Sequence, residues 1–180
     1  MVEFAMVLMP MLLIVVGIIQ LGLLFAANVT LTNAAREAAR SATIYSFDIA
    51  ASRASNDVER CTDALEAARQ SFGILTTASP HFVTTNPCPA GSAVDLNGDG
   101  YHDRWVNGDM IMTLCASMAT STSPCPTTGT YCAKDDPVGC LVQVSITYRS
   151  DIVVPFIGAL LDTDANGRFI QRSVATMVMN

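Results

Sequence analysis

The chain combines 180 residues with a formal net charge of −6, and most of its apolar excess lies in the first 27 residues. So acidic a chain lacks the basic surface that binding to nucleic acid requires, and we exclude that class of function. The length fits one domain, or one domain with an appended segment.

The first predicted element is an apolar helix from Phe4 to Ala27, a run that contains no charged side chain. At about 1.5 Å per residue it spans roughly 36 Å, which is enough to cross a bilayer with some tilt. A secretory signal peptide fits poorly, because no basic segment precedes the run and no clear cleavage site follows it. A plain membrane anchor fits the hydropathy and stays open as an interpretation.

Glu3 stands at the edge of this run and is the only ionisable side chain among the first 35 residues. A carboxylate near the middle of a membrane costs roughly 2.5 to 3.5 kcal/mol, so it normally has a partner or a path to water. A lone membrane anchor offers Glu3 no partner.

An amphipathic, alanine-rich segment follows the apolar run directly. No glycine or proline interrupts the chain between Gly22 and Phe72. We therefore expect one continuous helical rod of about 40 to 50 residues within residues 1–54. The apolar positions that recur at helical spacing are Leu31, Ala34, Ala35, Ala38, Ala42 and Tyr45.

A second helix is expected from Asp57 to Leu75, with Ser55, Asn56 and Asp57 as candidate N-cap residues. After a proline-rich loop the pattern becomes strand-like. The sequence thus predicts an α+β fold: a long N-terminal hydrophobic helix, a second shorter helix, and a small antiparallel sheet in a head formed by residues 55–180. The expected strands are Met110–Cys115, Leu141–Tyr148 and Phe169–Met179.

Six cysteines lie beyond residue 60, and none of them forms a CxxC pair. An even number without metal-ligand spacing favours disulfides in an oxidising compartment over reduced thiols in a cytosolic core. Six cysteines allow 15 connectivities, and the sequence does not select one. Our nested guess pairs Cys61 with Cys88, Cys115 with Cys140, and Cys125 with Cys132.

The stretch DLNGDGYHD has the spacing of a calcium-binding loop. Gly100 takes the turn position, and Val106 stands where a bidentate acid would complete the site. We therefore expect a weak Ca²⁺ site, of the kind that suits an extracellular protein, and the alternative is an Asx-rich surface turn. The candidate ligands are Asp95, Asn97, Asp99 and Asp103, with the backbone carbonyl of Tyr101.

A weaker version of the same spacing occurs in DTDANGRF. Asp162, Asp164 and Asn166 are the second metal candidates, with Gly167 at the turn position. The Asn-Gly pair ahead of an expected strand favours a simple turn.

No candidate catalytic site emerges from the sequence. His81 lies in the proline-bounded segment and His102 lies in the acidic loop, so neither has evident triad partners. Trp105 is expected to pack this loop against the sheet. We expect a protein that is not an enzyme and that uses no organic cofactor.

The N-terminal segment resembles a known family. It combines VEFA at Val2–Ala5, a proline at position 10, the hydrophobic helix, and TNAAREAAR at Thr32–Arg40. These features are typical of TadE-like proteins, which are pilin-like subunits of tight-adherence, type IV-related pilus systems. The resemblance covers about the first 45 residues, and the later half agrees only in outline.

The resemblance implies a structural subunit of an extracellular pilus-like filament, or fimbrium. A prepilin peptidase would process it, and it would wait in the inner membrane for the pilus assembly machinery. Copies of the chain would then assemble through the N-terminal helix, with Glu3, Phe4 and Pro10 as assembly residues. Two alternatives stay open: a minor pilin, or a membrane-anchored extracellular calcium-binding or adhesive domain that does not polymerise.

Overall fold

The computed structural model describes residues 2–44, 52–72, 80–89, 93–96, 98, 100, 102–115, 132, 139–152 and 163–179. Within these residues the chain forms two helices followed by a five-stranded antiparallel sheet, which confirms the predicted α+β class. The elements are α1 (Val2–Thr43), α2 (Arg53–Ser71), β1 (Ala93–Val94), β2 (Arg104–Asn107), β3 (Met110–Cys115), β4 (Leu141–Asp151) and β5 (Arg168–Val178).

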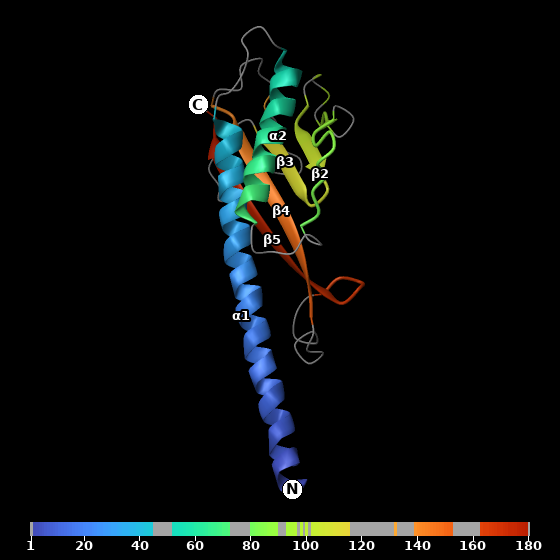
Figure 1. Cartoon of the computed structure of the whole chain (residues 1–180). Helices are drawn as coiled ribbons and strands as arrows, with labels where there is room; N and C mark the ends of the chain where they lie inside the picture. The colour runs from blue at the N-terminus through green and yellow to red at the C-terminus, as the bar shows by residue number, and fades with distance from the viewer. Residues whose placement is uncertain are drawn as a thin grey trace.

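The first helix, α1, is a single rod of 42 residues that continues through Pro10. The predicted fusion of an apolar and an amphipathic segment is therefore confirmed. Figure 1 shows that its N-terminal half projects beyond the head, whereas its C-terminal half lies along the sheet and α2. Residues 45–51 lie outside the described residues, so the predicted boundary at residue 54 stays a prediction.

The second helix, α2, begins at Arg53, and the predicted start at Asp57 was wrong. The physical reason is a different cap. Ser52 has an extended backbone, and its side-chain oxygen accepts a hydrogen bond from the backbone N–H of Ser55 at 3.3 Å. The predicted end at Leu75 lies outside the described residues.

The sheet is a meander in which each strand pairs with the next one along the chain. The three predicted strands are present as β3, β4 and β5, and the sequence did not indicate β1 or β2. β4 is a long interior strand, and it pairs with the edge strand β5 over eleven residues, from Leu141 opposite Val178 to Asp151 opposite Arg168.

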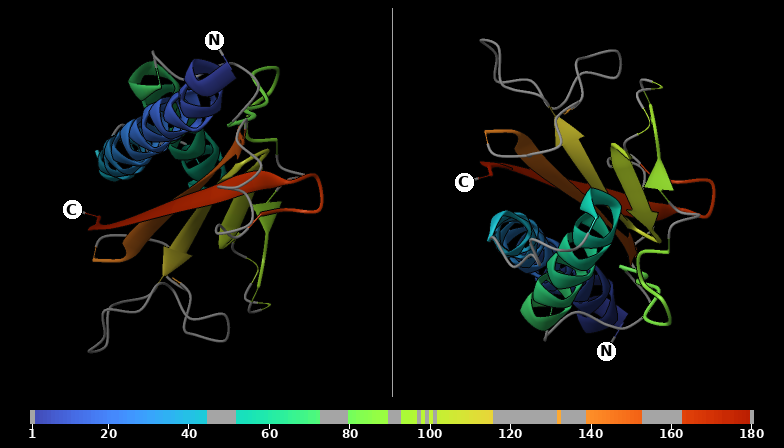
Figure 2. Two further views of the ribbon diagram at one scale, coloured as in Figure 1. Left: turned by 90° about the horizontal axis from the view of Figure 1, so that it is seen from below. Right: turned by 90° about the horizontal axis from the view of Figure 1, so that it is seen from above.

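Both helices cover the same face of the sheet (Figure 2). Trp105, Met112, Val144 and Ala175 lie opposite one another on four neighbouring strands, and all four are buried. Alanines on α1 let the other elements approach closely, because a methyl group keeps the backbones near each other. The buried small and apolar positions of α1 are Leu24, Ala27, Leu31, Ala34, Ala35, Ala38, Ala39 and Ala42.

Candidate functional site

The N-terminal half of α1 exposes apolar side chains on all its faces. Between Phe4 and Ile19 every large apolar side chain except the half-buried Val16 is exposed, with fractions from 43% at Leu8 to 76% at Met6. Within the most apolar stretch of 18 residues in this helix, only 11% is buried. This half is therefore not the core helix of a globular domain. By length and composition, α1 is able to cross a membrane.

The predicted assembly residues lie at the free end of this exposed half. Phe4 is 72% exposed, and Pro10 is also exposed within the continuous helix. Glu3 belongs to the first turn of α1, and its side chain lies outside the described part of the chain. Phe4 and Pro10 thus both lie on the uncovered apolar part of the helix.

Gln20 is the first described side chain of α1 that is buried, after the half-buried Val16 and Gly17. One turn later, the side-chain amide of Gln171 on β5 donates a hydrogen bond to the backbone carbonyl of Leu24 at 3.0 Å. Sequence reasoning missed both glutamines, although a glutamine in an apolar run was a visible signal. They mark where the head meets the helix and help fix the register between the two.

The first acidic loop connects β1 to β2. The Asp95 carboxylate accepts backbone N–H groups from Gly98 at 2.7 Å and from Gly100 at 2.9 Å. Both glycines have positive φ, as the predicted turn requires. Asn97, Asp99 and Tyr101 lie outside the described residues.

Asp103 closes this loop at its other end. Its side chain is buried, and one carboxylate oxygen accepts the backbone N–H of Leu96 at 2.9 Å. Carboxylate oxygens are ligands that Ca²⁺ prefers, so the residue types of this loop are compatible with Ca²⁺. Among the described residues, however, no three His, Cys, Asp or Glu side chains are grouped to hold a metal. Calcium binding stays a prediction.

The second acidic loop precedes β5. Asp164 accepts hydrogen bonds from the backbone N–H groups of Asn166 and Arg168, both at 2.9 Å, and pairs with the Arg168 guanidinium at 3.0 Å. The backbone N–H of Arg168 is the largest cause that lowers the pKa of Asp164 below its ordinary value of 3.8. The carboxylate thus serves the turn. Asp162 lies outside the described residues.

The disulfides agree with the predicted pairing only in part. Cys61 on α2 bonds to Cys88, as expected. Cys132 bonds to Cys140, so the guesses that pair Cys115 with Cys140 and Cys125 with Cys132 were wrong. The two cysteines of this disulfide are only eight residues apart in the sequence, so the bond closes a short local loop. Cys115 is also disulfide-bonded, and Cys125 lies outside the described residues.

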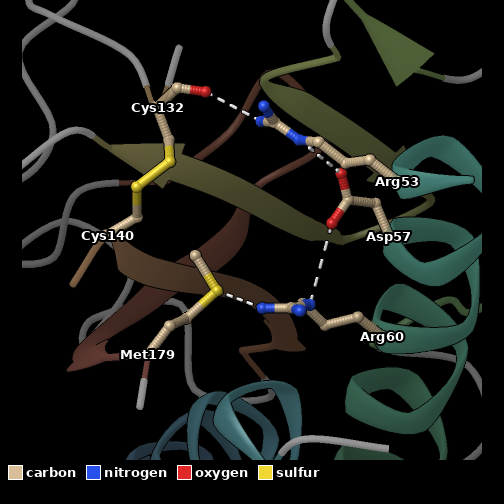
Figure 3. The surroundings of a disulfide bond; sticks show 6 residues. All are labelled: Arg53, Asp57, Arg60, Cys132, Cys140 and Met179. Carbon is tan, nitrogen blue, oxygen red and sulfur yellow. Dashed lines mark hydrogen bonds and ion pairs between the residues drawn. A yellow bond between two sulfur atoms is a disulfide. The ribbon is translucent and has the colours of Figure 1, made fainter. Parts of the chain in front are cut away.

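A buried charge cluster lies beside the Cys132–Cys140 disulfide (Figure 3). The Asp57 carboxylate pairs with the guanidinium of Arg53 at 3.3 Å and with that of Arg60 at 3.8 Å, and the three side chains are at most 9% exposed. Arg53 also donates to the backbone carbonyl of Cys132 at 2.8 Å. The charge cluster thereby ties α2 to the disulfide.

Figure 3 also shows Arg60 reaching the sulfur of Met179, just past the end of β5. Burial raises the pKa of Asp57, and the positive charges of Arg60 and Arg53 oppose this shift. The spacing of these three residues along one helix was visible in the sequence, but their burial was not.

A further polar group fixes the turn between β2 and β3. Asp109 accepts the backbone N–H of His81 at 2.7 Å and forms an ion pair with Arg149 on β4. Gly108 packs directly against the backbone of His81. A Cβ at position 108 would lie 2.1 Å from the His81 carbonyl oxygen, so this position requires glycine. His81 therefore acts here through its backbone. Trp105 is 1% exposed in the core.

Comparison with known proteins identifies the N-terminal segment. Residues 1–40 match the family described as TadE-like protein, which confirms the resemblance over that part of the chain. The match covers the exposed N-terminal half of α1 and all of its buried alanines except Ala42. No curated protein and no solved structure matches the chain. The apolar helix and the TadE-like segment together indicate a location at a membrane or a cell surface.

Proposed function

We propose that this protein is a structural subunit of an extracellular pilus-like filament. In this proposal the exposed half of α1 stays in the inner membrane before assembly and packs against the same helix of other copies afterwards. The head, held by disulfides, faces the solvent. The role is structural, and the protein carries out no chemical reaction.

The observation that carries the proposal is the uncovered N-terminal half of α1. A helix that is apolar on every face is stable only in lipid or among other helices. The head buries one face of α1 from Gln20 onward and, apart from the half-buried Val16 and Gly17, leaves the preceding described side chains exposed. The TadE-like match over residues 1–40 favours an environment that changes from lipid to neighbouring helices.

Glu3 supplies the proposed registration between copies. In a filament its carboxylate would pair with the α-amino group of a neighbouring subunit. Removing one member of a buried ion pair costs roughly 3 to 5 kcal/mol, which is enough to disfavour assembly. The same change would leave the distant head unaffected.

The test is to express Glu3→Ala with the assembly machinery and to image filaments at the cell surface. We expect membrane insertion and a folded head, but few or no filaments. Glu37→Ala is the matched control, because Glu37 lies on the same helix with an exposed side chain. Normal filaments in Glu3→Ala cells would refute the proposed registration. A wild-type chain that stays monomeric with the machinery present would refute the subunit role.

A minor pilin or a non-polymerising anchored domain is the alternative proposal. The uncovered helix supports it equally, since a membrane anchor has the same surface. Copy number distinguishes the two proposals. A major subunit should dominate the material sheared from the cell surface, whereas a minor pilin or an anchored domain should remain scarce there.

We further propose that the loop between β1 and β2 binds Ca²⁺ weakly and stabilises the head. The support is the turn around Asp95, whose carboxylate accepts hydrogen bonds from the backbone N–H groups of Gly98 and Gly100. Asp95→Asn keeps an oxygen acceptor for one of the two hydrogen bonds and removes the charge. Calcium should raise the melting temperature of the wild-type protein and should have a smaller effect on Asp95→Asn. Equal responses to calcium and to a chelator would mean that the loop is only a turn.

A further inference from the structure

The exposed N-terminal half of α1, which we call its bare half, is nearly as long as the hydrocarbon core of a bilayer is thick. From Phe4 to Ile19 it covers sixteen residues, about 24 Å, against about 30 Å for the hydrocarbon core of a bilayer. Val16 and Gly17 are half-buried, and Gln20 is buried by the head. If the bare half lies in lipid, the membrane surface falls near Gln20, directly under the head.

One end of the sheet reaches the same level. Gln171 lies beside Leu24, as their hydrogen bond requires. From Gln171, β5 extends three residues further to Arg168, about 10 Å along the strand. On α1, the step back from Leu24 is about 8 Å to Ile19 and about 12 Å to the half-buried Val16. The strand therefore begins at about the level where the bare half of α1 ends.

Figure 1 shows this arrangement directly. The end of the sheet where β4 stops and β5 begins points toward the N-terminal end of α1 and lies lower than the rest of the sheet. Ile170, at this end of β5, has an exposed fraction of 43%. An exposed isoleucine here suits contact with lipid.

We propose that, before assembly, the β4–β5 end of the head rests on the lipid surface. The proposal depends on the membrane-inserted state described under the proposed function. The protein then touches the bilayer at two places, α1 and the β4–β5 end of the sheet. Two contacts fix how the head is turned relative to the membrane, whereas a single helix would leave it free to rotate.

Tryptophan probes in the full-length chain test this contact. Ile170→Trp reports on the β4–β5 end, and Val178→Trp is its matched control. Both side chains are exposed and lie on the same face of the same strand, eight residues apart, which is about 26 Å. Ile14→Trp reports on the bare half of α1. The buried Trp105 gives a constant background in all variants.

The variants are reconstituted into phosphatidylcholine vesicles that carry either a nitroxide on the lipid headgroup or bromine on the acyl chains. We expect the headgroup nitroxide to quench Ile170→Trp at least threefold more than Val178→Trp, and brominated chains to quench Ile14→Trp. Ile152→Trp, at the end of β4, should behave like Ile170→Trp and serves as a second probe.

Two failures are distinguishable. If Ile14→Trp is quenched by brominated chains while both probes at the β4–β5 end match Val178→Trp, the lipid contact of the head is refuted and membrane insertion stands. If Ile14→Trp is not quenched, the membrane-inserted state of the proposed function is refuted as well.

Discussion

At the scale of single residues, Asp57 holds together a cluster of three buried charges in the head. It lies between two buried guanidiniums, one of which also binds the backbone next to a disulfide. Asp57→Ala should lower the free energy of unfolding by roughly 3 to 5 kcal/mol, because it leaves two positive charges buried without their carboxylate. Urea unfolding in detergent, followed by circular dichroism, measures this change.

Glu66→Ala is the control for that prediction. Glu66 pairs with Arg69 on the same helix, but both side chains are about half exposed. Such a pair contributes about 1 kcal/mol or less. If Asp57→Ala and Glu66→Ala destabilise the protein equally, the buried charge cluster does not stabilise the head.

Asp164 predicts a dependence of stability on pH. Its pKa is lowered in the folded protein, chiefly by the backbone N–H of Arg168, so folding favours the ionised carboxylate. This stabilisation is fully present above the ordinary pKa of 3.8 and is lost as the pH falls through the lower folded value. Asp164→Asn should therefore be less stable than wild type at pH 7. The difference in melting temperature should shrink below pH 3.8, and a difference that is constant with pH would contradict the assignment.

At the scale of elements, the buried alanines of α1 form the surface against which α2 and the sheet pack, which we call the alanine seam. Ala38 is fully buried among α2 and the sheet. Ala38→Leu adds three carbon atoms where no space exists, and we expect a loss of about 1 to 3 kcal/mol in the free energy of unfolding. Ala26→Leu, on an exposed position of the same helix, should have little effect. Equal melting temperatures for the two variants would show that the seam tolerates larger side chains.

The elements with strong periodicity were predictable from the sequence. The long apolar and alanine-rich run identified α1, and the strict alternation after Leu141 identified β4. The two-residue β1 and the four-residue β2 carry too little pattern to be recognised, because their pairing depends on neighbours distant in the sequence. The start of α2 was misplaced because several polar residues compete to cap it, and the one that does is Ser52.

At the candidate calcium loop, the local turn was predictable from spacing alone, whereas calcium binding stays a prediction. The turn around Asp95 has the inward carboxylate and the positive-φ glycines that the motif requires. The disulfide pairing was not predictable, because loop closure in the folded chain selects one of many connectivities. The burial of Asp57 was also hidden, since a charged residue on a helix is usually exposed.

At the scale of the whole molecule, α1 divides into a bare part and a covered part at Gln20. A chain that begins at Gln20 should fold and stay soluble without detergent, because every contact between α1 and the head beyond that residue is retained. A chain that begins at Asn33 loses the buried Leu24, Ala27 and Leu31. It should be less stable by at least about 2 to 5 kcal/mol, the cost of emptying one buried leucine site. Size-exclusion chromatography and thermal melting compare the two chains.

The hydrogen bond between Gln171 and Leu24 and the alanine seam lie along the length of α1 rather than across it. A pull along the helix axis would therefore load these contacts in shear, all at the same time, and would not peel them apart one by one. Contacts that share a load yield at higher force than contacts that break in sequence. If the chain is part of a filament under tension, its head is attached in the direction that best withstands pulling.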